Sequence, residues 1–171
     1  MTKREIKYLD FFEKFKKHHS SPKIVVTALL LSEIINRFIR DVSYNKFCAT
    51  NGITPDKTHY KSTYRLTKEY KQAYISLCDD IETFSHLYEL VNDDCGTKIL
   101  GSSILKSPPL KLDFNDLYYC LLAKQNGYII VTDDSDFFVE DVEIITYNNS
   151  LIENANYVIA ENARKAAAKK S

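Results

Sequence analysis

The chain has 171 residues, of which 44% are apolar and 27% charged, with only 4 Gly and 4 Pro. This composition excludes a collagen-like or largely disordered chain, because enough apolar surface can be buried to offset the entropy lost on folding. The longest apolar run, residues 24–31, is far shorter than the roughly 20 residues of a membrane-spanning helix, so we expect no membrane partner. The N-terminal segment alternates in charge, which predicts no signal peptide and a cytoplasmic location.

The formal net charge is zero, but the charge is segregated along the chain. Residues 1–75 hold 15 Lys/Arg against 7 Asp/Glu, whereas residues 76–160 hold 4 against 15. A basic segment joined to an acidic one is typical of a protein that attracts a polyanion with one surface and gathers carboxylates around a cation with another. The alternative is a solvated surface whose charges happen to segregate.

The first half of the chain reads as helix, strand and helices. Apolar residues spaced by three predict a helix over 5–18, and a β-branched run predicts a buried strand over 23–27. Helix-forming residues continue from Ala28 to Arg40, and turn formers fill 51–56. Apolar and aromatic steps of three and four then predict one long helix, or two with a break, over 57–91.

The second half alternates helices with apolar strands. A helix is predicted to open near Asp113–Asp116 and to end at Asn126-Gly127. Residues 128–132 and 142–146 read as strands, separated by the acidic loop 133–136, whereas 107–109 is irregular and 161–171 is a frayed or solvated helix. This order predicts an α/β fold whose mostly parallel sheet is buried on both faces.

Three acidic residues are predicted to gather at one edge of that sheet. Glu33 lies in the first turns after the first strand, Asp116 starts a helix, and Asp134 follows a strand. Because the carboxyl ends of parallel strands open onto one edge, the three side chains could reach the same crevice. Each also has a structural explanation: a surface glutamate, a helix N-cap and a turn residue, respectively.

Such a carboxylate cluster requires a cation. Two carboxylates about 5 Å apart repel by roughly 3 kcal/mol at an effective dielectric of about 20. Oxygen ligands without histidine or cysteine favour Mg²⁺ or Mn²⁺ over Zn²⁺, and the four cysteines show no zinc-ligand spacing. A hard metal ion can deprotonate water and stabilise the charge of an in-line attack on a phosphodiester, so the sequence indicates a nuclease.

Lysines alternate with tyrosines in the first half of the 57–91 segment. Such interleaved cations and rings can neutralise phosphates and stack bases. Alternatively the tyrosines form a buried stripe and the lysines its wet side, and both interpretations hold together if the lysines face RNA. The candidate RNA-contacting residues are Arg37, Lys57, Lys61, Arg65, Lys68 and Lys71.

Two segments carry a family resemblance. The first is Val25-Val26-Thr27-Ala28-Leu29-Leu30-Leu31-Ser32-Glu33, and the second runs from Asp116-Leu117-Tyr118-Tyr119 through Gly127 to Thr132-Asp133-Asp134-Ser135-Asp136-Phe137. An aspartate opening a helix, then a glycine, an apolar strand and Thr-x-Asp-x-Asp-Phe resembles the C-terminal signature of the PIN-domain family of metal-dependent ribonucleases. The resemblance covers residues 23–41 and 112–147.

The resemblance implies a fold, a site and partners. It implies a three-layer α/β/α sandwich and a metal site made by Glu33, Asp116 and Asp134, with Asp136 as an accessory ligand. It further implies an Mg²⁺- or Mn²⁺-dependent endoribonuclease that acts on RNA, with a toxin-like role in which an antitoxin protein covers the acidic crevice. A homodimer is also implied. The predicted organisation is one domain over 1–150 with a helical insertion at about 57–92, followed by a C-terminal helix or tail over 151–171.

One expected family element is not found. Family members begin with an apolar strand ending in an aspartate, and Ile6-Lys7-Tyr8-Leu9-Asp10 is the single candidate here, yet its spacing continues as a helix. We therefore expect residues 5–18 to be helical and the strand to be missing from this sequence. A catalytically silent PIN-like module that binds RNA or a protein is the alternative function, and a flap-type nuclease acting on DNA is a third.

Overall fold

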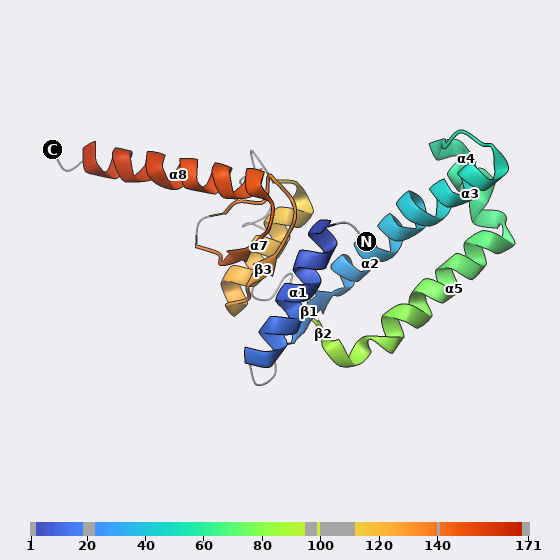
Figure 1. Cartoon of the computed structure of the whole chain (residues 1–171), viewed down its shortest axis with the longest axis horizontal. Helices are drawn as coiled ribbons and strands as arrows, with labels where there is room; N and C mark the ends of the chain where they lie inside the picture. The colour runs from blue at the N-terminus through green and yellow to red at the C-terminus, as the bar shows by residue number, and fades with distance from the viewer. Residues whose placement is uncertain (1–2, 19–22, 95–98, 100–111, 140, 169–171) are drawn as a thin grey trace. The chain divides into compact units, whose positions relative to one another are not determined.

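The computed structural model describes residues 3–18, 23–94, 99, 112–139 and 141–168, and Figure 1 shows its helices and strands. Contacts divide the chain into two compact units. Unit 1 comprises Met1–Ser20 and Asp94–Ser171, and unit 2 comprises Ser21–Asp93. Helices combine with short parallel strand pairs, which confirms the mixed α/β class and the parallel pairing expected from the sequence. The predicted boundaries at 150 and at 57–92 stay predictions.

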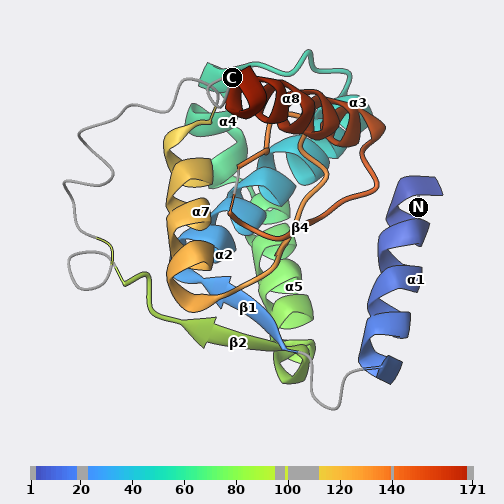
Figure 2. The ribbon, with the colours of Figure 1, turned by 90° about the vertical axis from the view of Figure 1, so that its left-hand side faces the viewer.

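Unit 2 contains one parallel strand pair. β1 (Ile24–Thr27) pairs with β2 (Tyr88–Val91), with Ile24 opposite Tyr88, as Figure 2 shows. Residues 88–91 were predicted as the end of a helix, and this prediction is wrong. The helical spacing extends through Tyr88 by chance, whereas the short segment gains its hydrogen bonds from β1, a partner that a local pattern does not reveal.

A long helical run follows β1 and changes its winding in the middle. α2 (Ala28–Arg37) passes into the π-helix η1 (Phe38–Tyr44) and then into α3 (Asn45–Asn51), which ends at Gly52 in the left-handed region. The predicted end at residue 40 is therefore too early. The buried residues Ile39, Tyr44 and Cys48 are five and four positions apart. The wider π turn, with its i to i+5 hydrogen bonds, compensates for the extra residue and keeps them on one side.

The remaining helices of unit 2 fold back on this run. α4 (Lys57–Ser62), the 3₁₀ turn η2 (Tyr64–Leu66), α5 (Lys68–Thr83) and the turn η3 (Ser85–Leu87) follow in order. Side chains of Asp56 and Thr67 cap α4 and α5 by accepting hydrogen bonds from backbone amides. The break after α4 agrees with the prediction of two helices in place of one.

Aromatic rings form much of the unit 2 core. Tyr64 is fully buried, and its ring lies 5.1 Å from Tyr44, 5.0 Å from Phe47 and 5.6 Å from Tyr70. The Tyr64 hydroxyl also shares a 2.7 Å hydrogen bond with Ser43. The prediction that tyrosines of the 57–91 segment form a buried stripe is confirmed for Tyr64 alone; Tyr60 and Tyr70 are half-buried against it, and Tyr74 is exposed.

Unit 1 holds the second strand pair. α1 (Lys3–His18) confirms the helix predicted over 5–18, and α7 (Phe114–Asn126) ends at Gly127, which is left-handed with φ +67°. β3 (Ile130–Val131) pairs in parallel with β4 (Ile144–Ile145), so both strands are shorter than predicted. α8 (Asn149–Ala168) begins two residues before the predicted boundary.

Part of the sequence discussed above is not described by the structure. The segment 107–109, predicted to be irregular, and Cys95 lie outside the described residues. No helix among the described residues combines the length and apolar content that crossing a bilayer requires.

Candidate active site

Chain direction brings Asp116 and Asp134 to the same end of an α–β pair in unit 1. α7 ends at Gly127 and the chain turns back into β3, as Figure 2 shows, so the first turn of α7 and the residues after β3 share one end. Asp116 lies in that first turn, and Asp134 follows β3 by three positions. Because β4 runs parallel to β3, this end is the carboxyl edge of the strand pair, where the sites of parallel sheets open.

Asp116 is not the N-cap of α7. That position belongs to Asp113, whose Oδ1 accepts a 2.9 Å hydrogen bond from the Asp116 amide. The structural explanation that the sequence offered for Asp116 is therefore wrong, since Asp113 already satisfies the amide at this helix end. The carboxylate of Asp116 stands one helical turn before the thiol of Cys120.

The thiol of Cys120, next to that carboxylate, is buried and has a raised pKa. Burial, and secondarily the negative charge of Asp116, raise the pKa of the Cys120 thiol to about 12. A thiol with this pKa stays protonated at neutral pH, and a protonated thiol is a poor nucleophile.

The loop after β3 is an ordered succession of side-chain turns. The hydroxyl of Thr132 accepts a 3.1 Å hydrogen bond from the Asp134 amide, and Asp134 Oδ1 accepts one of 3.0 Å from the Asp136 amide. The hydroxyl of Ser135 donates to Asp136 Oδ1 at 3.3 Å. The turn role foreseen for Asp134 is thus confirmed, and both Asp134 and Asp136 are exposed, so solvent ions can reach their carboxylates.

Two residues that sequence reasoning missed hold this loop in place. The Tyr8 hydroxyl of α1 lies 2.8 Å from the Thr132 carbonyl and 3.0 Å from Asp133 Oδ1, and it accepts a 3.0 Å hydrogen bond from the Tyr147 amide. Asn148 donates through Nδ2 to the Asp133 carbonyl at 2.6 Å. Tyr8 is more than 120 positions from these partners, and no local pattern signals such a contact.

Asn148 also begins the last helix. Its Oδ1 accepts a 3.0 Å hydrogen bond from the Ser150 amide, so the same side chain caps α8 and binds the acidic loop. An asparagine before a helix was a recognisable cap signal in the sequence, although its contact with Asp133 was not.

Glu33 belongs to unit 2, whereas the aspartates belong to unit 1. It is half-buried in α2, whose N-cap Thr27 accepts a hydrogen bond from the Leu30 amide. The convergence of Glu33 with Asp116 and Asp134 stays a prediction. Among the residues that the structure describes, no group of three or more His, Cys, Asp or Glu side chains is arranged to hold a metal ion, and the Mg²⁺ or Mn²⁺ site is likewise a prediction.

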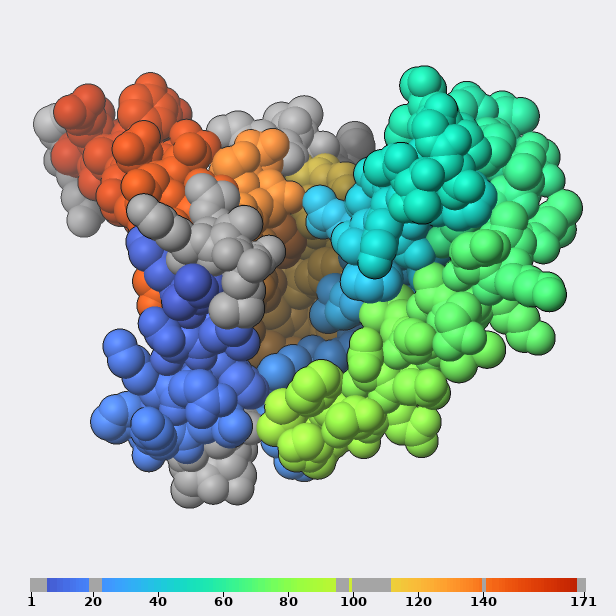
Figure 3. Space-filling model, turned by 45° about the vertical axis from the view of Figure 1, so that its right-hand side comes forward, coloured from blue at the N-terminus to red at the C-terminus, as the bar shows by residue number. Residues whose placement is uncertain are grey.

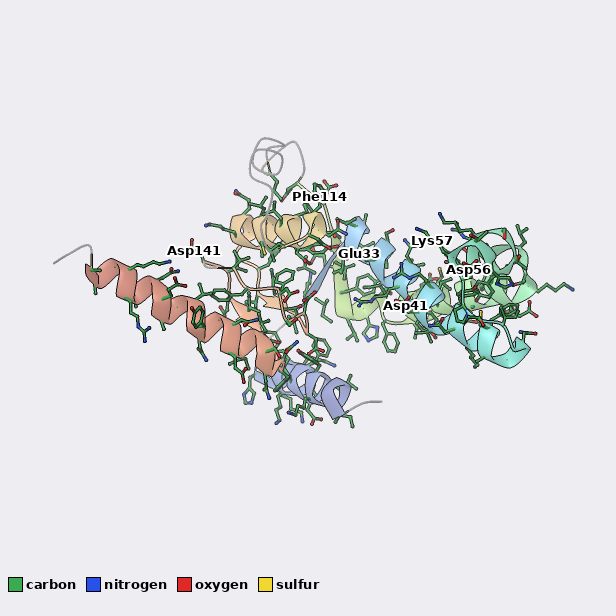
Figure 4. All side chains as sticks on the ribbon, turned by 90° about the horizontal axis from the view of Figure 1, so that it is seen from above. Glu33, Asp41, Asp56, Lys57, Phe114 and Asp141 are labelled. Carbon is green, nitrogen blue, oxygen red and sulfur yellow. The ribbon has the colours of Figure 1, made fainter. Side chains whose placement is uncertain are left out.

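The candidate RNA-contacting residues are exposed and occupy two places on unit 2. Arg37 is one turn from Glu33, and its Nε lies 3.8 Å from Asp41. The other five lie on α4, η2 and the start of α5, and α4 and η2 contact the helical run at Ser43 and Tyr44, roughly 15 Å along it from Glu33 at 1.5 Å per helical residue. Figure 4 labels Glu33 near β1 and Lys57 close to Asp56, at the start of α4; we call Lys57, Lys61, Arg65, Lys68 and Lys71 the basic tip.

The basic tip combines exposed lysines with a constrained arginine. Lys57 and Lys61 line a shallow depression of about 360 Å³ on α4. The guanidinium of Arg65 lies 5.8 Å from the Tyr60 ring and 5.9 Å from the Tyr70 ring, so two aromatic faces orient it. In the space-filling view of Figure 3 the tip is the blue-green and green part of unit 2. Such a surface can bind phosphates through the lysines.

The chain matches no family model, and no curated protein or solved structure matches it. The resemblance to the PIN-domain family therefore depends on the motifs of residues 23–41 and 112–147.

Proposed function

We propose that this chain is an Mg²⁺- or Mn²⁺-dependent endoribonuclease of the PIN type, with a three-layer α/β/α sandwich and a cytoplasmic location. One observation carries the proposal: carboxylates follow or flank the carboxyl ends of both parallel strand pairs. Asp134 follows β3, Asp116 opens the helix antiparallel to β3, and Glu33 is in the helix that directly follows β1. Parallel sheets place their reactive groups at these ends.

The donor set suits a hard divalent cation. Exposed carboxylates of the acidic loop and the carboxylate of Asp116 offer the oxygen ligands that Mg²⁺ and Mn²⁺ prefer. In the proposal Glu33, Asp116 and Asp134 hold the metal and Asp136 supports it. The ion, when bound, would lower the pKa of a water molecule and offset the charge that develops on the phosphate.

In the proposal, different side chains bind the metal ion and the RNA. The Asp134 carboxylate accepts a hydrogen bond from the Asp136 amide, so it would need little reorganisation to bind an ion. The lysines of the basic tip would bind RNA phosphates, and an antitoxin protein would act by covering the acidic crevice. RNA and such an antitoxin are thus the proposed partners.

A single-residue substitution tests the nuclease proposal. Asp116→Asn keeps the shape of the side chain and removes its charge. Loss of a residue that only supports a metal ligand lowers activity about 10–100-fold. Because Asp116 is proposed to bind the metal directly, we expect cleavage of a single-stranded RNA panel to fall by more than this. Asp141→Asn is the matched control, because Asp141 is an exposed aspartate at φ +67°, a conformation that asparagine tolerates. A chelator should stop cleavage, and Mg²⁺ or Mn²⁺ should restore it.

The outcomes separate the candidate functions. Equal activity of the two variants would reject Asp116 as part of the site. Preferential cleavage of DNA flaps over RNA would favour the flap-type nuclease.

A silent RNA-binding module is the second candidate, favoured by the placement of the basic tip on α4, η2 and α5, none of which carries a candidate metal ligand. In that case the parent chain cleaves nothing but binds RNA in the presence of chelator. The double variant Lys57→Glu, Lys61→Glu should then bind RNA more weakly. The slope of log K against log salt concentration should become shallower by about one for each phosphate that the lysines no longer neutralise. Unchanged binding by this double variant would exclude the basic tip as the RNA surface.

A further inference from the structure

The Tyr8 hydroxyl lies at the carboxyl edge of the β3–β4 pair. Thr132 directly follows β3, and Thr146 directly follows β4. The Tyr8 hydroxyl is 2.8 Å from the Thr132 carbonyl and 3.4 Å from Thr146 Oγ1, so it contacts the first residue after each strand. It is also 3.0 Å from Asp133 Oδ1. The N-terminal half of α1 therefore lies at the edge where the acidic loop begins.

Lys7 brings an ammonium group to this same edge. Its Nζ lies 5.7 Å from the centroid of the Tyr147 ring, and Tyr147 is the second residue after β4. The Tyr147 ring in turn packs edge-on against Tyr8, with 5.2 Å between the ring centroids. A cation over an exposed aromatic face is attracted by about 0.5–1 kcal/mol, which favours this orientation of the lysine side chain.

No carboxylate neutralises this ammonium. Lys7 is exposed, and within the described part of the chain it contacts the Tyr147 ring but forms no ion pair. The acidic loop that begins at this edge carries Asp134 and Asp136, both exposed. Exposed carboxylates repel a polyanion, and an exposed ammonium beside them attracts one. The edge thus offers a cation that an anionic ligand from solvent can reach.

We propose that Lys7 binds a phosphate of the RNA next to the phosphate at which the chain is cut. This assignment rests on the proposed function, because it takes RNA as the substrate and the acidic loop as part of the site. Lysine binds phosphate as a compact point charge on a flexible side chain, so it needs no fixed partner geometry. Lys7 belongs to unit 1 and is therefore a cation additional to the basic tip, which belongs to unit 2.

The role of Lys7 is binding and not chemistry. A phosphate beside the reacting one carries the same charge before and during cleavage, so the ammonium stabilises the bound substrate and the transition state equally. Loss of such uniform binding raises KM and leaves kcat unchanged. A residue that merely stabilised the fold would not produce this division between the two constants.

RNA binding in the presence of a chelator tests Lys7 without requiring cleavage. For Lys7→Gln in the full chain, we expect the Kd of a single-stranded RNA at low salt to rise about 2–5-fold, the range of one exposed ion pair. The slope of log K against log salt concentration should become shallower by about 0.7, the value for one phosphate of a single strand.

Lys16→Gln is the matched control. Lys16 lies over the Phe12 ring at 5.4 Å, so both variants lose one lysine charge and one contact between a cation and a ring. Nine positions after Lys7, Lys16 is on the opposite side of α1 and about 13 Å further along it. Its ammonium also pairs with Glu13 at 3.5 Å. We therefore expect Lys16→Gln to leave the Kd for RNA unchanged, and thermal unfolding compares the stability of the two variants.

The outcomes separate this assignment from the nuclease proposal. Equal Kd values for the two variants would overturn the role of Lys7. So would tighter Mn²⁺ binding by Lys7→Gln with unchanged RNA affinity, because the lysine would then only offset the charge of the acidic loop. A lower kcat at unchanged KM would overturn the binding of a neighbouring phosphate. A parent chain that cleaves nothing would contradict the nuclease, whereas weaker RNA binding by Lys7→Gln alone would still support Lys7 as an RNA-binding residue.

Discussion

Replacement of Tyr8 by Phe is the sharpest test of how α1 is held against the acidic loop. The substitution removes one oxygen atom and keeps the ring, including its edge-on contact with Tyr147 at 5.2 Å between ring centroids. The hydroxyl links the Thr132 carbonyl at 2.8 Å with the Tyr147 amide at 3.0 Å, so the variant leaves one acceptor and one donor without this partner.

The expected loss follows from the burial of these groups. An unsatisfied buried polar group costs about 1–3 kcal/mol, and Tyr8 is half-buried, so water can replace part of the lost bonding. We therefore expect a loss of about 1–2 kcal/mol in the free energy of unfolding. For a chain of this size such a loss lowers Tm by about 2–8 °C. The Tyr147 amide should exchange with solvent about 5–30-fold faster, since that is the population change that 1–2 kcal/mol produces.

Tyr157→Phe provides the control for this measurement. Tyr157 is 70% exposed on α8, so removal of its hydroxyl should change the free energy of unfolding by less than about 0.5 kcal/mol. If Tyr8→Phe and Tyr157→Phe unfold alike and the exchange rate of the Tyr147 amide is unchanged, α1 does not hold the loop through this hydroxyl, and the account of the loop's rigidity fails.

Two further predictions concern α7. Asp113→Ala should cost about 1 kcal/mol in chemical denaturation because the Asp116 amide loses its capping partner, whereas a change below about 0.3 kcal/mol would contradict the cap. Cys120 should resist iodoacetamide in the folded chain at pH 8, while half-buried Cys78 reacts. Because folding raises the Cys120 pKa to about 12, its contribution to stability is complete below the ordinary value of about 8.5 and decreases as pH rises toward 12. Equal labelling of both thiols would contradict the burial of Cys120.

The elements that the sequence predicted correctly are those specified by neighbouring residues. α1 follows a three-residue apolar spacing, and Gly127 ends α7 because it readily adopts the left-handed conformation found there. β1 could also be predicted, because its β-branched run is a local signal. The turn at Asp134 belongs to the same group, since it depends on side chains two positions apart.

The elements that were missed depend on residues far away in the chain. β2 forms because Tyr88–Val91 pairs with β1, which lies more than sixty positions earlier in the chain. The spacing of apolar residues up to Tyr88 is also that of a helix, so the local pattern did not reveal the strand. The helix after β1 continues past Arg40 because Tyr44 and Cys48 belong to the buried cluster that includes Tyr64 and Leu77. Burial of both residues on one side requires the π turn η1, which helix propensities do not predict.

The same distinction applies to the candidate site. The carboxylates could be chosen from their positions beside apolar strands, because strand direction alone determines which end they occupy. Their support could not, since Tyr8 reaches Thr132 from a helix at the other end of the sequence. The Tyr8 hydroxyl contacts residues that follow both β3 and β4, and so it positions the start of the loop that carries Asp134, one of the proposed metal ligands. The loss of metal-dependent activity on Tyr8→Phe, relative to Tyr157→Phe, would therefore measure how much of the proposed site is built by α1.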